Sequence, residues 1–140
     1  MKILLAADGS KYTKKALAFL VNQDSLSGPD NEVVVLHVQP VIPPRVKGMV
    51  GAAAVKSYHE EEAAKVLDPI RKFLDRKGIS YKAEWRTGNS SEEILAGAKK
   101  AKAHMIVMGT HGHGLLGRAV MGSVAQRVIA QCDIPVLLVK

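Results

Sequence analysis

Short apolar runs alternate along this chain with longer segments that carry apolar residues at helical spacing. The apolar runs lie at residues 2–7, 33–38, 79–86, 105–108 and 136–139. Apart from the loosely alternating run at 79–86, they are nearly continuous, which is typical of strands buried on both faces. Between the runs, apolar residues recur three and four positions apart at 10–21, at 58–77, from residue 90 onward and at 123–131. This spacing predicts amphipathic helices.

The order of these elements predicts an α/β protein. Alternating strands and helices form a parallel sheet, and strands that are apolar throughout need helices on both faces of it. A length of 140 residues leaves room for one domain. We therefore expect residues 1–140 to form a single-domain, open, mostly parallel five-stranded sheet with helices on both faces.

Local signals predict where the helices begin and end. Ser10 is a candidate N-cap of the first helix, and Ser90 opens a serine-to-glutamate spacing typical of a capping box. Pro69 lies inside the predicted helix 58–77 and is expected to kink or divide it, and Gly78 suits its C-terminal end. Residues 27–31 form a turn cluster.

Residues 39–57 fit no regular element. The segment contains Pro40, Pro43 and Pro44, followed by a run rich in glycine and alanine at 48–54. Long irregular segments in compact domains are usually functional or mobile loops. Two interpretations stay open: a lid that covers a ligand, and a segment without fixed structure.

Composition narrows the class of protein. The chain is 47% hydrophobic and 24% charged, as in ordinary globular domains. No apolar run approaches the ~18 residues of a membrane-spanning helix, and Asp8 interrupts the N-terminal apolar stretch before a signal peptide could form. Cys132 is the single cysteine, which excludes an intrachain disulfide and a thiolate metal cluster. We expect a cytoplasmic protein with no membrane contact.

The charge of the chain points to anionic partners without naming one. The formal net charge is +7, but the basic pairs at residues 14–15, 71–72, 76–77 and 99–100 are far apart in sequence and fit solvated helix faces. Aromatic residues make up only 4% of the chain, so the stacking platforms of nucleic-acid-binding proteins are scarce. Two kinds of partner stay open, a small anion and an acidic protein surface. Nucleic acid is not expected as a partner.

Candidate chemistry follows the first, second and fourth predicted strands, at Asp8, at residues 38–40 and from Gly109 onward. In open parallel sheets, ligands bind outside the carboxyl ends of the strands. The segment 109–123 is rich in glycine, which permits positive φ and close approach of backbone amides to a ligand. Gly122 and Ser123 open the last helix, where a phosphate is favoured. Two alternatives stay open. In one, the glycines only form turns; in the other, Asp8 and Ser123 only cap helices.

Other familiar sites are absent or poorly supported. The chain has no phosphate-binding loop with the Gly-x-x-x-x-Gly-Lys-Ser/Thr pattern, no Gly-x-Gly-x-x-Gly after the first strand and no Gly-x-Ser-x-Gly elbow. His111 and His113 have no carboxylate or thiol nearby in sequence and make a poor metal site. His37 lies in a predicted buried strand and is expected to be a hydrogen-bonded core histidine.

The glycine segment resembles the nucleotide-binding branch of the universal stress protein family. That branch is marked by Gly, two residues, Gly, nine residues, then Gly and Ser or Thr, which here are Gly109, Gly112, Gly122 and Ser123. The segments 3–10, 36–38 and 135–139 also resemble the family. The resemblance covers the whole chain and is weakest between residues 40 and 57.

This resemblance implies a Rossmann-like fold of the adenine nucleotide hydrolase type and a site for ATP, with AMP or ADP as alternatives. Mg²⁺ would be held through the phosphates. The roles carried over by position are as follows: the adenine–ribose end falls to Ala6, Asp8 and Val38, the phosphates to Gly109, Gly112, Gly122 and Ser123, and the walls to Met108 and Val124. Arg118 lies within the loop and would offer a cation to the phosphates.

The resemblance also implies a homodimer that pairs through the strand 136–139, and a nucleotide-sensing module of the stress response with at most slow ATP hydrolysis. No residue is placed as an evident general base. Two other functions stay open: a weak ATPase or phosphotransferase assisted by His111 or His113, and a nucleotide-free protein whose basic surface binds an acidic partner.

Overall fold

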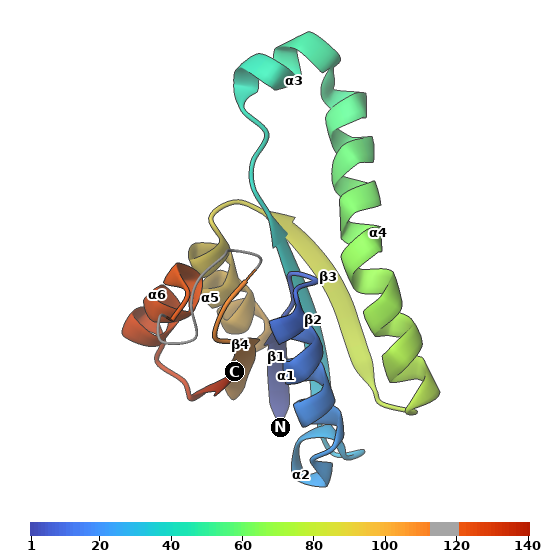
Figure 1. Cartoon of the computed structure of the whole chain (residues 1–140), viewed down its shortest axis with the longest axis vertical. Coiled ribbons are helices and arrows are strands. Elements are labelled where there is room, and N and C mark those ends of the chain that lie inside the picture. The colour runs from blue at the N-terminus through green and yellow to red at the C-terminus, as the bar shows by residue number, and fades with distance from the viewer. Residues whose placement is uncertain (113–120) are drawn as a thin grey trace.

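A computed structural model describes residues 1–112 and 121–140 and contains one five-stranded sheet. The strand order is β3-β2-β1-β4-β5, and every neighbouring pair is parallel (Figure 1). The strands are β1 (Lys2–Ala6), β2 (Glu32–Gln39), β3 (Tyr81–Thr87), β4 (Met105–Gly109) and β5 (Val136–Val139). The open five-stranded parallel sheet predicted from the sequence is thus confirmed.

Helices cover both faces of the sheet. The described helices are α1 (Lys11–Val21), α2 (Asp24–Ser27), α3 (Pro44–Val50), α4 (Ala52–Arg76), α5 (Ser90–Ala101) and α6 (Ser123–Gln131). Figure 1 shows α1 and α4 on one side of the sheet and α5 and α6 on the other. The helices therefore form the two outer layers, with the sheet between them.

The central position of β1 in the sheet explains why its residues 3–6 are all apolar. Ile3 and Leu5 pack into the cluster shared with α1 and α4. Leu4 and Ala6, whose side chains point to the opposite face, pack into the cluster shared with α5 and α6. Both faces of β1 are buried from Ile3 to Ala6, so none of these positions favours a polar side chain, and the one charged residue, Lys2, stands at the partly exposed start of the strand.

The segment between β2 and α4 differs from the prediction. Residues 44–50 form α3, and α4 begins at Ala52, six residues before the predicted start. Pro44 occupies the first turn of α3, where a missing N–H costs nothing, and the run of alanines at 52–54 has strong helix propensity. Gly51, at φ 88°, separates the two helices. The proline and small residues that suggested a loop are here compatible with helices.

Two other boundaries are corrected. Pro69 does not divide α4, which is one helix of 25 residues, anchored on both sides of the proline by buried residues that include Leu67 and Ile70. The N-cap of α5 is Asn89, not Ser90: its side chain accepts a hydrogen bond from the Glu92 backbone N–H. Ser10 caps α1 as predicted.

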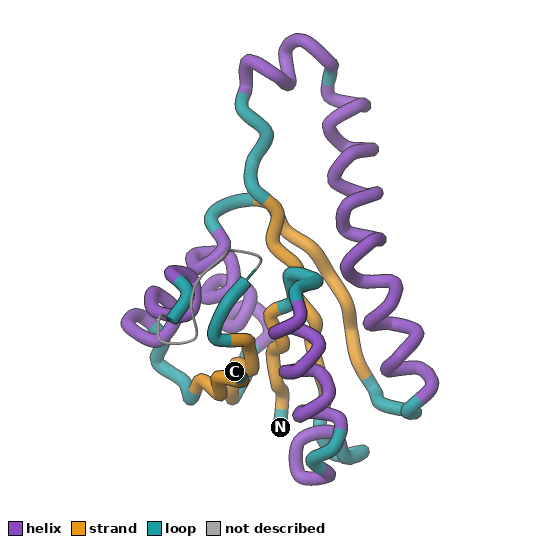
Figure 2. The backbone as a smooth tube through the Cα atoms, viewed as in Figure 1, coloured by secondary structure: helices purple, strands orange, loops and turns teal. Residues whose placement is uncertain are grey.

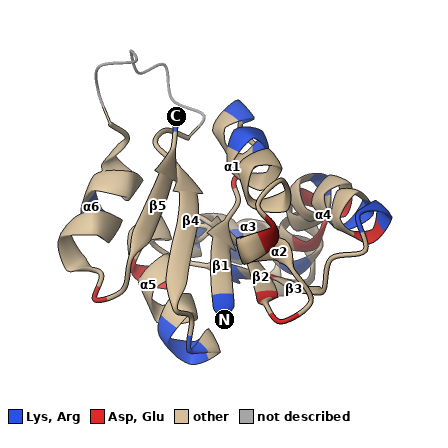
Figure 3. Cartoon of the chain, turned by 90° about the horizontal axis from the view of Figure 1, so that it is seen from below, with Lys and Arg blue, Asp and Glu red and all other residues tan. Residues whose placement is uncertain are grey.

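None of the described helices is both long and apolar enough to span a bilayer. The longest, α4, carries acidic and basic side chains along its length, and the backbone tube in Figure 2 shows it running well beyond the end of the sheet together with α3. Figure 3 shows basic residues on several elements, including α1, α4 and the end of α5. This spread agrees with charges that solvate separate helix faces.

Candidate functional site

A pocket of about 330 Å³ lies at the carboxyl ends of β1, β2 and β4. It is within the range of small-molecule sites. The structure brings to its walls all the predicted site residues that it describes: Ala6, Asp8, Val38, Met108, Gly109, Gly112, Gly122, Ser123 and Val124. Arg118 lies outside the described residues.

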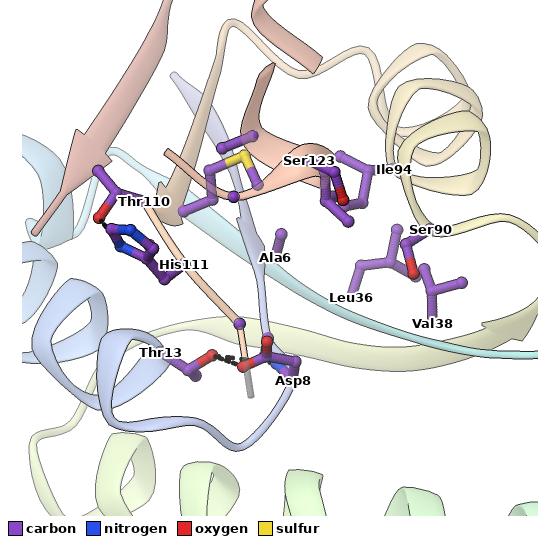
Figure 4. A pocket seen from close by; sticks show the side chains of 17 residues that line it. Ala6, Asp8, Thr13, Leu36, Val38, Ser90, Ile94, Thr110, His111 and Ser123 are labelled. Carbon is purple, nitrogen blue, oxygen red and sulfur yellow. Dashed lines mark hydrogen bonds between the residues drawn. The ribbon is translucent and has the colours of Figure 1, made fainter. Parts of the chain in front are cut away.

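The pocket has an apolar part that sequence reasoning found only partially. Leu36 and Val38 of β2 and Ile94 of α5 line it, together with the Ser90 hydroxyl at the start of α5 (Figure 4). The sequence predicted Val38 but missed the other three. Ser90 and Ile94 carried one usable signal, because they belong to the helix that directly follows a strand end. A slot with apolar walls suits a flat, weakly polar ring.

Asp8 is held in position by the first turn of α1. Its Oδ1 accepts hydrogen bonds from the Ser10 backbone N–H at 2.9 Å and from the Thr13 hydroxyl at 2.7 Å. The Thr13 Oγ1 in turn accepts from the Asp8 backbone N–H at 3.0 Å. Asp8 thus supports the start of α1, while Ser10 is the N-cap, and its carboxylate also lines the pocket. The capping and ligand-binding interpretations of Asp8 are structurally compatible.

Three glycines of the predicted motif are required by lack of space rather than by positive φ. Gly109, Gly112 and Gly122 are absent from the described glycines that have positive φ. A Cβ on Gly109 would lie 2.5 Å from the Tyr12 Cβ, and one on Gly122 would lie 3.0 Å from the Thr110 carbonyl oxygen. A Cβ on Gly112 would lie 2.8 Å from Asp8 Oδ2. Gly109 and Gly122 therefore allow the chain to pack on itself, and Gly112 leaves space beside Asp8.

The N-terminus of α6 forms the polar end of the pocket. Gly122 is the N-cap of α6, so the interpretation of Ser123 as the cap is wrong. The Gly122 N–H donates to the Thr110 carbonyl at 2.8 Å and is used within the chain. The next three amides, of residues 123–125, have no acceptor inside the helix, and all three residues line the pocket. These amides and the helix dipole favour an anion.

The histidines near the site have structural partners. The His37 ring is buried, and its Nδ1 donates to the Ala7 carbonyl at 2.8 Å, which confirms the predicted core role. His111 is also buried and lines the pocket, with its Nδ1 2.8 Å from the Thr110 hydroxyl and its ring packed against Tyr12. His113 lies outside the described residues. Among residues 1–112 and 121–140, no group of three or more His, Cys, Asp or Glu side chains could hold a metal ion.

Comparison with known proteins identifies the family. The model of the universal stress protein family matches residues 1–140. The chain belongs to the universal stress protein family. The relative MJ0531 of Methanocaldococcus jannaschii, named a universal stress protein, is 34% identical, over 99% of this chain and 81% of its own.

Solved structures of the universal stress protein family share this fold. The structure of protein MJ0577 from M. jannaschii superposes with a TM-score of 0.84 at 31% identity, over 99% of this chain and 94% of that one. An Arabidopsis thaliana family member, with AMP bound, has a TM-score of 0.72 at 18% identity and coverages of 100% and 91%. An Archaeoglobus fulgidus member in complex with dAMP has a TM-score of 0.71 at 23% identity and coverages of 100% and 98%.

Proposed function

We propose that this universal stress protein binds an adenine nucleotide in the pocket and acts as a nucleotide-sensing module of the stress response. One observation carries the proposal: a single pocket joins an apolar slot between β2 and α5 to the N-terminus of α6, with the Asp8 carboxylate also on its wall. A nucleotide has the matching parts, a flat base, a ribose with hydroxyl groups and an anionic phosphate chain. The AMP and dAMP complexes of related proteins support the choice of adenine.

In this proposal, the two ends of the pocket hold the two ends of the nucleotide. Ala6 and Val38 contact the base, and Asp8 accepts hydrogen bonds from the ribose hydroxyls. The phosphates lie against the backbone at Gly109, Gly112 and Gly122 and at the Ser123 amide and hydroxyl, while Met108 and Val124 form walls. The predicted contribution of Arg118 concerns a residue that the structure does not describe.

We propose ATP as the physiological ligand, and Mg²⁺ would be held through its phosphates. The side-chain oxygens in the described part of the pocket belong to hydroxyl groups and one carboxylate, and His111 adds an imidazole. So few oxygen ligands suit an ion that keeps most of its water and binds chiefly through phosphate oxygens. In this arrangement the protein positions the nucleotide, and the metal neutralises phosphate charge.

The decisive experiment is mass spectrometry of the small molecules released by acid from freshly purified protein, followed by calorimetry with ATP, ADP and AMP. We expect an adenine nucleotide in the released fraction. Absence of any nucleotide, together with no heat of binding for all three, would contradict the proposal. It would instead favour a nucleotide-free protein whose basic surface binds an acidic partner.

Blocking the apolar slot should abolish nucleotide binding. Val38 is half-buried and lines the slot, so Val38→Trp is expected to fill it and to weaken the affinity for ATP more than tenfold, or about 1.4 kcal/mol, in calorimetry. Val41→Trp is the matched control, because Val41 is 63% exposed and lies outside the pocket. If both variants bind ATP like the native chain, the base does not occupy this slot.

The proposal includes no ATP hydrolysis faster than a slow, residual rate. The competing ATPase hypothesis is favoured by one observation, the position of His111 on the pocket wall. His111→Gln keeps a hydrogen-bonding side chain of similar size but cannot act as a general base. Rapid hydrolysis of ATP by the native chain that is lost in His111→Gln would support the enzyme hypothesis and contradict the regulatory one.

We further propose a homodimer that forms through β5, which is an edge strand of the sheet and only partly buried. The Pro135 carbonyl accepts a hydrogen bond from Ile106 of β4, and the Val139 carbonyl accepts one from Thr110, which directly follows β4. The alternation of a strand therefore turns the backbone groups of Leu138 away from β4. These outward groups are available to a second β5. Action in the cytoplasm and an additional protein partner stay predictions from the sequence.

Leu138→Pro tests this dimer. Proline is tolerated at an edge strand where its missing N–H faces away from the neighbour, so the protomer is expected to fold and only the dimer to be lost. Sedimentation velocity gives the mass, and circular dichroism verifies the fold. Leu137→Pro is the control, because the same alternation turns the Leu137 groups toward β4, and that variant should unfold. A folded Leu138→Pro variant that remains dimeric would exclude pairing through β5.

A further inference from the structure

Helix α3 and the first two turns of α4 form a helical hairpin, residues 44–58. This hairpin projects beyond the sheet (Figures 1 and 2). None of the residues 40–58 is buried, and none lines the pocket. The hairpin is therefore not a lid over the pocket in this structure. None of its residues contributes to the wall of the proposed nucleotide site in this structure.

The hairpin lacks the packing that normally stabilises short helices. Helix α3 has seven residues, and isolated helices shorter than about 12–15 residues are marginal in water even with favourable sequences. Most helical stability in proteins comes from packing of an apolar face, and the hairpin exposes its own. A binding partner would supply this missing contact.

The apolar side chains exposed by the described chain are concentrated here. Of the eight large hydrophobic side chains that are exposed in residues 1–112 and 121–140, five lie between residues 41 and 58. Val46, Met49 and Val50 follow the three-and-four spacing of one helix face, and Met49 is 78% exposed. Clustered exposed apolar residues of this kind mark interaction surfaces.

The charges beside this apolar face indicate which partner fits. Residues 40–59 carry three basic side chains, Arg45, Lys47 and Lys56, and no acidic one. The next three residues, 60–62, are all glutamates, and Glu60 and Glu61 are exposed. A partner must therefore offer negative charge next to positive charge, at the spacing of this hairpin. An anionic membrane offers only one sign, whereas a second copy of this chain offers both, because its basic hairpin is followed directly by the glutamates at 60–62. Glu60 also lies 3.9 Å from Lys56 of its own chain, as an exposed pair.

We infer that the hairpin docks on the hairpin of a second copy of this chain. In a twofold interface each contact occurs twice, so the basic residues Arg45 and Lys47 of each copy meet the Glu60–Glu61 pair of the other. The apolar side chains of Val46, Met49 and Tyr58 are buried between them. This interface is separate from β5, because α3 follows β2, and two strands stand between β2 and β5 in the sheet. Both surfaces can be occupied at once.

Complementary charge reversal tests the inference on the full chain. One variant carries Arg45→Glu and Lys47→Glu, and the other carries Glu60→Lys and Glu61→Lys. Each variant alone places like charges opposite one another at both contacts, so its self-association is expected to weaken at least tenfold in sedimentation velocity across a concentration series. An equimolar mixture restores both contacts and is expected to recover the mass of the native assembly.

Matched variants separate this interface from general effects of charge and from β5. Lys72→Glu with Arg76→Glu makes the same charge change at the far, exposed end of α4 and should leave self-association unchanged. Met49→Ser removes apolar contact without changing charge and should weaken association like the charge variants. Because the hairpin has no buried side chains, all these variants should fold, as circular dichroism can verify.

Several outcomes would overturn the inference. They are unchanged self-association in either charge-reversed variant, failure of the mixture to recover the native mass, and a native chain with no association step beyond the one removed by Leu138→Pro. Binding of the native chain to anionic vesicles, lost in Met49→Ser while self-association persists, would assign the hairpin to a membrane surface instead. None of these readouts depends on nucleotide binding, so the proposed function stands or fails separately.

Discussion

Replacing Asp8 by alanine is expected to weaken ATP binding by about ten- to a hundredfold, which corresponds to about 1.5–3 kcal/mol for hydrogen bonds to a charged group. The carboxylate lines the pocket and is fixed by hydrogen bonds to the Ser10 amide and the Thr13 hydroxyl. The substitution also leaves these two buried groups without their acceptor, so stability falls by about 1–3 kcal/mol. Calorimetry measures the affinity and urea unfolding measures the stability.

A control is needed because one substitution changes both quantities. Ser10→Ala removes the N-cap acceptor of the Thr13 amide and should cost about 1 kcal/mol of stability, but Ser10 does not line the pocket. Its affinity for ATP should therefore equal that of the native chain. Asp8→Asn keeps an oxygen for Ser10 and Thr13 and loses the charge, so it should recover stability more fully than affinity. If Asp8→Ala binds ATP with native affinity, Asp8 does not contribute to the nucleotide site.

Gly109→Ala is expected to cause the largest loss of stability among the glycine substitutions, about 3 kcal/mol, at the upper end of the usual range for overpacking. The added Cβ would lie 2.5 Å from the Tyr12 Cβ and 3.1 Å from the Tyr12 carbonyl carbon, so neither the side chain nor the backbone of α1 can yield easily. Thermal unfolding should show a midpoint lower by roughly 10 °C.

Gly48→Ala is the matched control for this effect. A Cβ on Gly48 meets no atom within 4 Å, and the residue lies inside α3, where alanine has the higher helix propensity by about 1 kcal/mol. This variant should be as stable as the native chain or more so. A Gly109→Ala variant with native stability would mean that α1 does not pack against the end of β4 as closely as described.

The strands and the site could be predicted because their sequence signals are local. Apart from β3, the strands are mostly apolar on both faces, and parallel strands bring their carboxyl ends together, so the sequence alone predicts that Asp8, Val38 and Gly109 meet at one pocket. The assignment of these residues to a nucleotide remains a prediction. What the sequence could not supply was contact across the fold: Ile94 reaches the pocket because α5 packs beside β2. Leu36, two residues before Val38 on the same strand face, could have been predicted from the alternation of β2.

The errors also have physical causes. The hairpin was missed because proline and glycine signal loops in general, whereas Pro44 lies in the first turn of a helix and Gly51 lies between two helices. The glycines of the motif line the pocket, but the reason that the sequence offers for them is incomplete. Conformational freedom was expected, and the structure shows close approach of Tyr12 to Gly109 and of Thr110 to Gly122. A single sequence contains no information on such distances.

Thr110 connects the pocket to the edge of the sheet. Its amide donates to the Val139 carbonyl of β5, and its own carbonyl accepts from the Gly122 amide at the start of α6. One residue thus links the pocket proposed for a nucleotide to the strand proposed to bind a second protomer. If a bound nucleotide changes the affinity of one protomer for another, dimerisation must change the affinity for the nucleotide. Thermodynamic reciprocity requires the two changes to be equal.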